Sequence, residues 1–84
     1  MRKTTQKIIG ENLKLLRTSH GMNQHQMAAI IGCSRALYAH YELGNRSQDT
    51  ETLFSICTYF GIDICSLFEP EHHNFLNIIR NCIG

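Results

Sequence analysis

Apolar residues recur three and four positions apart along almost the whole chain, which is the spacing that places them on one face of an α-helix. Within residues 6–20 they are Ile9, Leu13 and Leu16, with polar residues between them. Strict alternation of apolar and polar residues, the pattern of a half-buried strand, is absent. The pattern therefore predicts an all-α protein.

Residues that start and stop helices divide this pattern into six segments. Asn23, Ser34 and Asp63 have side chains that accept hydrogen bonds from the free amides at a helix start. Gly32 and Gly44 favour the left-handed conformation that ends a helix. The predicted helices are 6–20, 24–31, 35–43, 50–60 (with Asp49 as its N-cap), 64–68 and 72–83. We expect residues 1–70 to form a compact five-helix domain and residues 71–84 an additional C-terminal helix.

The segment 23–43 has the pattern of a helix-turn-helix. Asn23 caps its first helix, and Gln26 stands three residues later, as in a capping box. A tight turn at Gly32 leads to a second helix that begins after Ser34. In this motif the second helix enters the major groove of DNA.

Composition and charge fit a small folded domain with one basic half. The chain has 84 residues, of which 43% are hydrophobic, and a formal net charge of +1. Residues 1–48 hold seven basic and two acidic residues, a charge of +5, whereas residues 49–84 hold one basic and five acidic residues, a charge of −4. This asymmetry favours one face for a polyanion. We see no membrane span and no signal peptide, and therefore expect a cytoplasmic location.

From residue 9 to residue 68 the chain resembles the Cro/phage-repressor-like (XRE-type) helix-turn-helix family. The matching residues are Ile9-Gly10, Leu13, Leu16-Arg17, Gln24, Met27-Ala28, Gly32-Cys33-Ser34, Tyr41-Glu42, Gly44, Leu53, Ile56, Phe60-Gly61-Ile62 and Leu67. Gln48 stands where the family usually has a proline. The resemblance implies a lambda-repressor-like bundle of five helices that binds double-stranded DNA, and members that are mostly dimeric transcription regulators.

Three residues of the second helix are the predicted base contacts. Tyr38 and Tyr41 lie on the side expected to pack inward, which leaves Arg35, Ala36 and His40 facing out at positions where family members contact bases. Arg35 has the donor geometry for guanine O6 and N7. Ala36 is suited to apolar contact with a thymine methyl group, and His40 to a hydrogen bond with a base or a phosphate.

The predicted phosphate contacts surround this helix. The resemblance and the helix-terminus positions assign them to Gln24, Ser34, Asn45 and Arg46. Arg17 and Glu42 match a family pair that joins the first and third helices by a salt bridge, and we expect this pair to orient the recognition helix.

The C-terminal segment carries an apolar stripe that must be covered. Its members, which we interpret as dimerisation residues, are Phe75, Leu76, Ile79, Cys82 and Ile83. The stripe either packs against a second copy or folds back on its own bundle, in which case we expect dimerisation through the helix 64–68, near Ile64 and Phe68. We favour a homodimer through the stripe because two-fold symmetry presents two recognition helices to successive major grooves. A protein partner, as for an antitoxin, is the remaining use of this surface.

Metal binding and catalysis are the weaker alternatives. The five histidines and four cysteines show no zinc-type spacing, and His72 and His73 are adjacent, so they point in different directions on a helix. Cys33 and Cys57 occupy expected core positions, and no motif indicates an active site. We therefore predict no metal, no cofactor, no small-molecule ligand and no enzymatic activity. The sequence favours a DNA-binding regulator, a repressor that acts as a homodimer on a palindromic operator, over a protein-interaction module.

Overall fold

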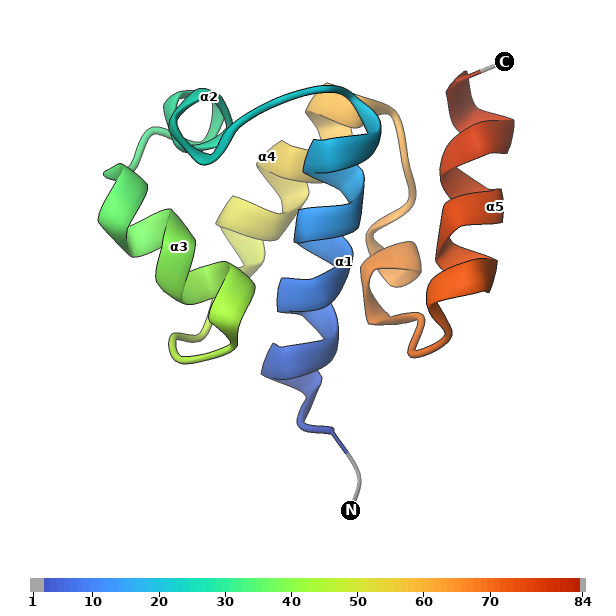
Figure 1. The fold of residues 1–84 in the computed structure, drawn as a ribbon, viewed down its shortest axis with the longest axis horizontal. Helices are drawn as coiled ribbons and strands as arrows, with labels where there is room; N and C mark the ends of the chain where they lie inside the picture. The colour runs from blue at the N-terminus through green and yellow to red at the C-terminus, as the bar shows by residue number, and fades with distance from the viewer. Residues whose placement is uncertain (1–2, 84) are drawn as a thin grey trace.

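The protein is an assembly of helices around a central first helix. The computed structural model describes the backbone of residues 3–83 and the side chains of residues 3–81. Its elements are α1 (Thr5–Ser19), α2 (Gln24–Ile31), α3 (Arg35–Leu43), α4 (Thr50–Phe60), the 3-10 helix η1 (Ile64–Phe68) and α5 (His72–Ile83) (Figure 1). No strand occurs within residues 3–83, which confirms the all-α prediction.

The predicted helix boundaries are met to within one residue, and capping explains the small shift in α1. The Thr4 side chain accepts a hydrogen bond from the Lys7 amide, so α1 starts at Thr5 and not at residue 6. Asn23 and Gln26 form the predicted capping box at the start of α2. The segment 64–68 is a 3-10 helix rather than an α-helix, because its backbone amides bond three residues back: Ser66 donates to the Asp63 carbonyl and Glu69 to the Ser66 carbonyl.

Figure 1 shows α1 running through the middle of the molecule, with α2 and α3 on one side and η1 and α5 on the other. α4 packs against α2 and η1. The side chains buried between these elements come from every helix and are Ile9, Leu13, Leu16, Met27, Ala28, Tyr38, Tyr41, Leu53, Ile56, Cys57, Ile62, Leu67, Phe75 and Ile79. Because α1 contributes to both sides of this core, it holds α3 and α5 at fixed positions.

Gly10 allows α3 to lie unusually close to α1. A Cβ atom at this position would stand 2.4 Å from the carbonyl oxygen of Tyr41 and 2.6 Å from that of Glu42. Distances below about 3 Å are not tolerated between a methyl carbon and a backbone oxygen, so only glycine fits here. The missing side chain therefore sets the distance between α1 and the C-terminal half of α3.

Asn12 ties the opposite side of α1 to the chain that leads into α5. Its side chain is fully buried, and its amide nitrogen donates to the carbonyl oxygens of Leu67 and Glu69, both at 2.8 Å. Buried carbonyls need such donors, since water cannot reach them. This amide fixes the end of η1, from which the turn to α5 departs.

The structure corrects the interpretation of the C-terminal stripe as a surface for a second copy. Phe75 is fully buried and Ile79 is 2% exposed within the single chain, and Leu76 is half-buried against the same core. α5 packs on α1 and η1, so these side chains are covered by their own bundle. The side chains of Cys82 and Ile83 lie outside the described residues.

The two cysteines expected in the core differ in their environment. Cys57 is buried in α4, where desolvation raises the pKa of its thiol to about 11 and the nearby Asp63 carboxylate adds to the shift. Cys33 is only half-buried, in the turn between α2 and α3, and packs against the edge of the core without being enclosed by it. The cause is its place directly after Gly32, where the chain leaves the bundle before α3 begins.

Candidate nucleic-acid interface

α3 presents an exposed polar face beside two buried tyrosines. Tyr38 is fully buried and Tyr41 is 9% exposed, which confirms the predicted inward orientation of both. On the opposite face Arg35, Ala36 and His40 are all exposed. The three predicted base-contacting residues therefore share one accessible side of α3, within its first two turns.

The turn that precedes α3 determines how this face is presented. Gly32 adopts φ +83°, a left-handed conformation that ends α2 and redirects the chain. The Ser34 hydroxyl then accepts from the Leu37 amide at 3.1 Å and caps α3. This bond uses one lone pair of the hydroxyl, whose proton remains free for an acceptor such as a phosphate oxygen.

The other predicted phosphate contacts lie at both ends of the two-helix unit. Asn45 and Arg46 are exposed in the loop after α3, and the Asn45 amide stands 3.5 Å from the imidazole Nδ1 of His40. Gln24, the first residue of α2, is half-buried, and its side chain bonds to other side chains of the protein. The structure thus places the four residues around α3 but gives Gln24 an additional, internal role.

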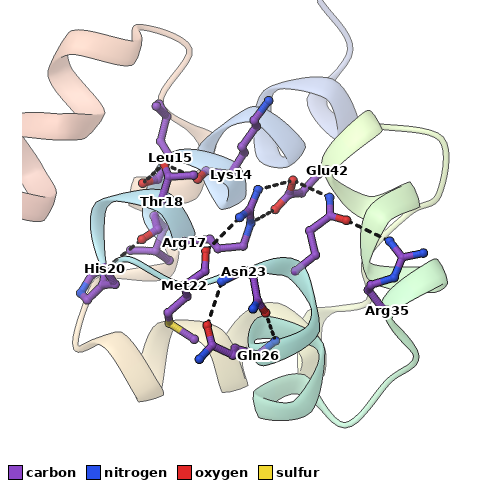
Figure 2. Close-up of polar contacts among 12 residues, drawn as sticks. Lys14, Leu15, Arg17, Thr18, His20, Met22, Asn23, Gln26, Arg35 and Glu42 are labelled. Carbon is purple, nitrogen blue, oxygen red and sulfur yellow. Dashed lines mark hydrogen bonds and ion pairs between the residues drawn. The ribbon is translucent and has the colours of Figure 1, made fainter.

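Arg17 and Glu42 form the predicted salt bridge between α1 and α3. Arg17 Nε donates to Glu42 Oε2 at 2.6 Å and Nη2 to Oε1 at 3.2 Å, while Nη1 donates to the Met22 carbonyl at 2.9 Å (Figure 2). The two side chains are only 12% and 5% exposed. A bidentate pair with so little solvent contact has fixed geometry, whatever its net contribution to stability.

The pair keeps both groups charged. Burial alone would raise the pKa of Glu42, but hydrogen bonds from Arg17 and Gln24 hold the pKa below its ordinary value of 4.5. The same carboxylate raises the pKa of Arg17. Burial and the neighbouring Glu42 carboxylate raise the pKa of Tyr38 well above its ordinary range, so its hydroxyl stays protonated.

A cleft of 330 Å³ lies between α1, the start of α2 and the outer side of α3. Its lining residues are Lys7, Glu11, Lys14, Arg17, Gln24, Ala39, Glu42 and Leu43. Both acidic residues are already paired with cations, Glu11 with Lys3 and Glu42 with Arg17. Among the described residues, Lys7 and Lys14 form no ion pair with a carboxylate, and both line a cleft that adjoins the α3 face.

Lys7 and Lys14 were missed as candidate contacts in the sequence. They are seven residues apart, or two helical turns, and so lie on one side of α1. The Lys7 ammonium donates to the Leu43 carbonyl at 3.3 Å, which places it at the C-terminal end of α3. The seven-residue spacing was a usable signal, but it did not say that this side of α1 lies next to α3.

The fold and this interface define a helix-turn-helix protein. The helix-turn-helix family profile matches residues 13–67, which is more than half of the chain. The chain therefore belongs to the XRE-type helix-turn-helix family, as the resemblance indicated.

Several relatives share most of this region. The chain is 35% identical over 68 residues to the SPbeta prophage-derived uncharacterized HTH-type transcriptional regulator YonR of Bacillus subtilis (strain 168), over 81% of this chain and 63% of that protein. It is 40% identical over 55 residues to antitoxin PezA of Streptococcus pneumoniae, over 66% of this chain and 35% of that protein. It is 27% identical to the cryptic phage CTXphi transcriptional repressor RstR of Vibrio cholerae, over 80% of this chain and 60% of that protein. The chain thus spans less than two thirds of each of these relatives.

A solved structure shares the whole fold. The clp gene regulator ClgR from C. glutamicum superposes with a TM-score of 0.70, covering 99% of this chain and 97% of that chain, at 17% sequence identity. The superposed region extends into the segment after residue 70. In the described part of the chain, no helix is long and apolar enough to cross a membrane.

Proposed function

We propose that the protein is a sequence-specific regulator of transcription that binds double-stranded DNA, and that it acts as a repressor. The observation that carries the proposal is the exposed Arg35, Ala36 and His40 on one face of α3. Around them stand groups suited to phosphate, namely the Ser34 hydroxyl and Arg46. Base edges specify sequence, whereas phosphate contacts fix the position of the protein on the duplex.

Membership of a DNA-binding family and the names of the relatives support this proposal. YonR is described as a transcriptional regulator and RstR as a transcriptional repressor. A regulator of this kind acts by binding DNA and not by catalysis. We therefore also propose that it acts in the cytoplasm, where bacterial and phage DNA is found. We extend the proposal to binding without a cofactor or a small-molecule ligand.

We further propose that two copies bind a two-fold symmetric operator. In such complexes the recognition helices enter successive major grooves about 34 Å apart. The molecule measures 33 × 29 × 21 Å, so its longest dimension is comparable with this spacing. Since Phe75 and Ile79 are buried in their own chain, the contact between copies falls on other residues.

A selection from random duplex DNA tests the proposal. Wild-type protein and Arg35→Ala are used in parallel at fixed, moderate salt. We expect the wild type to enrich a palindrome containing guanine, and Arg35→Ala to lose that base while keeping the rest, with a cost of about 1–3 kcal/mol. Binding by the wild type that is salt-sensitive but blind to sequence would reject the proposed function and leave only an electrostatic contact.

A second candidate is an antitoxin-like partner protein. The match to antitoxin PezA favours it, and so does the outer face of α4, where Phe54 is 60% and Tyr59 64% exposed. Exposed aromatic side chains are typical of protein interfaces. The DNA selection described above distinguishes the two candidate functions. A protein that binds only a protein partner, through α4, would show no base preference that depends on Arg35.

A further inference from the structure

A continuous series of hydrogen bonds connects the buried salt bridge to the proposed base-reading arginine. Glu42 Oε1, which accepts from Arg17, also accepts from the Gln24 amide nitrogen at 3.1 Å. The Gln24 amide oxygen in turn accepts from Arg35 Nη1 at 3.2 Å. Figure 2 shows the series from Arg17 through Glu42 to Arg35, which spans α1, α2 and α3.

Charge fixes the orientation of the amide in the middle of this series. With the nitrogen of Gln24 toward Glu42, a donor meets a carboxylate, and the oxygen faces the Arg35 guanidinium. The reverse orientation would place the amide oxygen against the carboxylate and the amide protons against a cation. Both contacts would then be repulsive, in a place where the Glu42 side chain is only 5% exposed and poorly screened.

The bond at Nη1 leaves one particular edge of Arg35 free. A guanidinium has five N–H groups in one plane, and Nε with Nη2 forms a parallel pair of donors. That pair matches guanine O6 and N7. Because Arg35 is exposed and its side chain has several rotatable bonds, a single anchoring bond removes part of the freedom that base recognition must otherwise remove.

We propose that Gln24 and Glu42 are positioning residues that determine the base preference of Arg35, with the Arg17–Glu42 pair acting on DNA readout through the Gln24 amide. The inference rests on the proposed function, since it concerns the same site. The sequence led us to expect that the buried Arg17–Glu42 pair only orients α3. The inference gives this pair an effect on specificity as well, because Gln24 connects Glu42 to Arg35. The second proton of the Gln24 amide remains available to a phosphate.

The test measures base preference rather than affinity alone. Four duplexes carry the selected operator with each base in turn at the position read by Arg35, and fluorescence anisotropy gives their dissociation constants at one salt concentration. The variants are Gln24→Met, which keeps the length of the side chain without an acceptor, and Glu42→Gln, which removes the charge. Arg46→Ala is the control, since it has a proposed phosphate contact and no bond in the series.

We expect the wild type to prefer guanine by about tenfold or more, as one bidentate pair provides. Gln24→Met and Glu42→Gln each reduce this preference to about threefold or less, and the double variant loses no more than either alone, because both act through one amide. Arg46→Ala weakens all four complexes by the same factor. Gln24→Met leaves the Arg17–Glu42 pair in place. If Glu42→Gln fails to fold, the base preference of Gln24→Met alone therefore tests whether the series of hydrogen bonds affects readout by Arg35.

Two results would overturn the inference, and they differ in kind. If both folded variants weaken all four complexes equally and keep the preference for guanine, the series is structural and the proposed function stands. If the wild type itself binds the four duplexes equally, sequence readout by Arg35 is absent, and the proposed function falls together with the inference.

Discussion

At the scale of single residues, the position of α3 depends on the absence of a side chain at Gly10. The carbonyl oxygens of Tyr41 and Glu42 occupy the space that a side chain at this position would need. Glu42 also forms the pair with Arg17, on the same two helices. The close approach and the ion pair therefore act together, because the pair can only form when α1 and α3 lie at this distance.

Gly10→Ala should destabilise the fold, although alanine is the better helix former. The gain in helix propensity is about 1 kcal/mol. A methyl group at 2.4 Å from a backbone oxygen forces α1 and α3 apart, and such overpacking costs about 1–3 kcal/mol or more. Because two backbone oxygens lie this close, the cost falls at the upper end of this range, and we expect a net loss of about 2 kcal/mol in the free energy of unfolding, measured by urea denaturation. Lys14→Ala, on an exposed position of the same helix, should stay within about 0.5 kcal/mol. An unchanged or raised stability of Gly10→Ala would show that α3 is not held in close contact with α1.

Neither Gly10 nor Asn12 could be assigned its role from the sequence. Both stand inside a helix whose apolar spacing was clear, but local spacing does not say which element lies against a given position. The acceptors of Asn12 are the carbonyls of Leu67 and Glu69, more than fifty residues away. The exposure of Arg35, Ala36 and His40 could be predicted from the sequence, because an amphipathic helix with two inward tyrosines has one outward face.

At the scale of elements, capping residues made the boundaries predictable. The side chain of each N-cap residue accepts a hydrogen bond from the backbone amide three residues later, as in Asn23, Ser34 and Asp49. Such bonds depend only on residues close together in the sequence. The packing of α5 was different in kind. The apolar stripe of α5 indicated that this face must be buried. It did not indicate whether its own chain or a second copy buries it, because the contacts of α5 with α1 and η1 are not encoded in a local pattern.

Phe75→Ala tests whether α5 belongs to the core of one chain. The side chain is fully buried, and removing a buried phenyl group costs about 3–5 kcal/mol through lost burial and the cavity left behind. We expect this loss in chemical denaturation at two protein concentrations that differ tenfold, with the same value at both. Asn77→Ala, exposed on the same helix, serves as the control and should change little. A loss that grows at the higher concentration would instead place Phe75 between two copies, because mass action then stabilises the wild-type dimer more than the weakened variant.

At the scale of the whole molecule, the split of charge along the chain becomes a split in space. Lys7, Lys14 and Arg17 lie in α1 and Arg35 in α3, whereas Glu69 and Glu71 lie in the turn between η1 and α5, on the far side of α1 from α3 (Figure 1). The sequence showed the imbalance but not where it is focused. In the structure Lys7 and Lys14 line a cleft beside the α3 face, while the acidic residues of that cleft are paired with Lys3 and Arg17.

This arrangement predicts that Lys14 contributes to DNA binding through a phosphate. Each phosphate contact releases condensed counterions, so the logarithm of the binding constant falls with the logarithm of the salt concentration by nearly one unit of slope per contact. We expect Lys14→Ala to make the slope less steep by about 1 and to weaken binding to specific and unrelated duplexes alike. Arg80→Ala removes an equal charge from the exposed side of α5 and should leave the slope unchanged. Equal slopes for wild type and Lys14→Ala would place the DNA backbone away from this cleft, whereas an equal decrease for Arg80→Ala would mean that net charge, not the position of the lysine, governs the salt dependence.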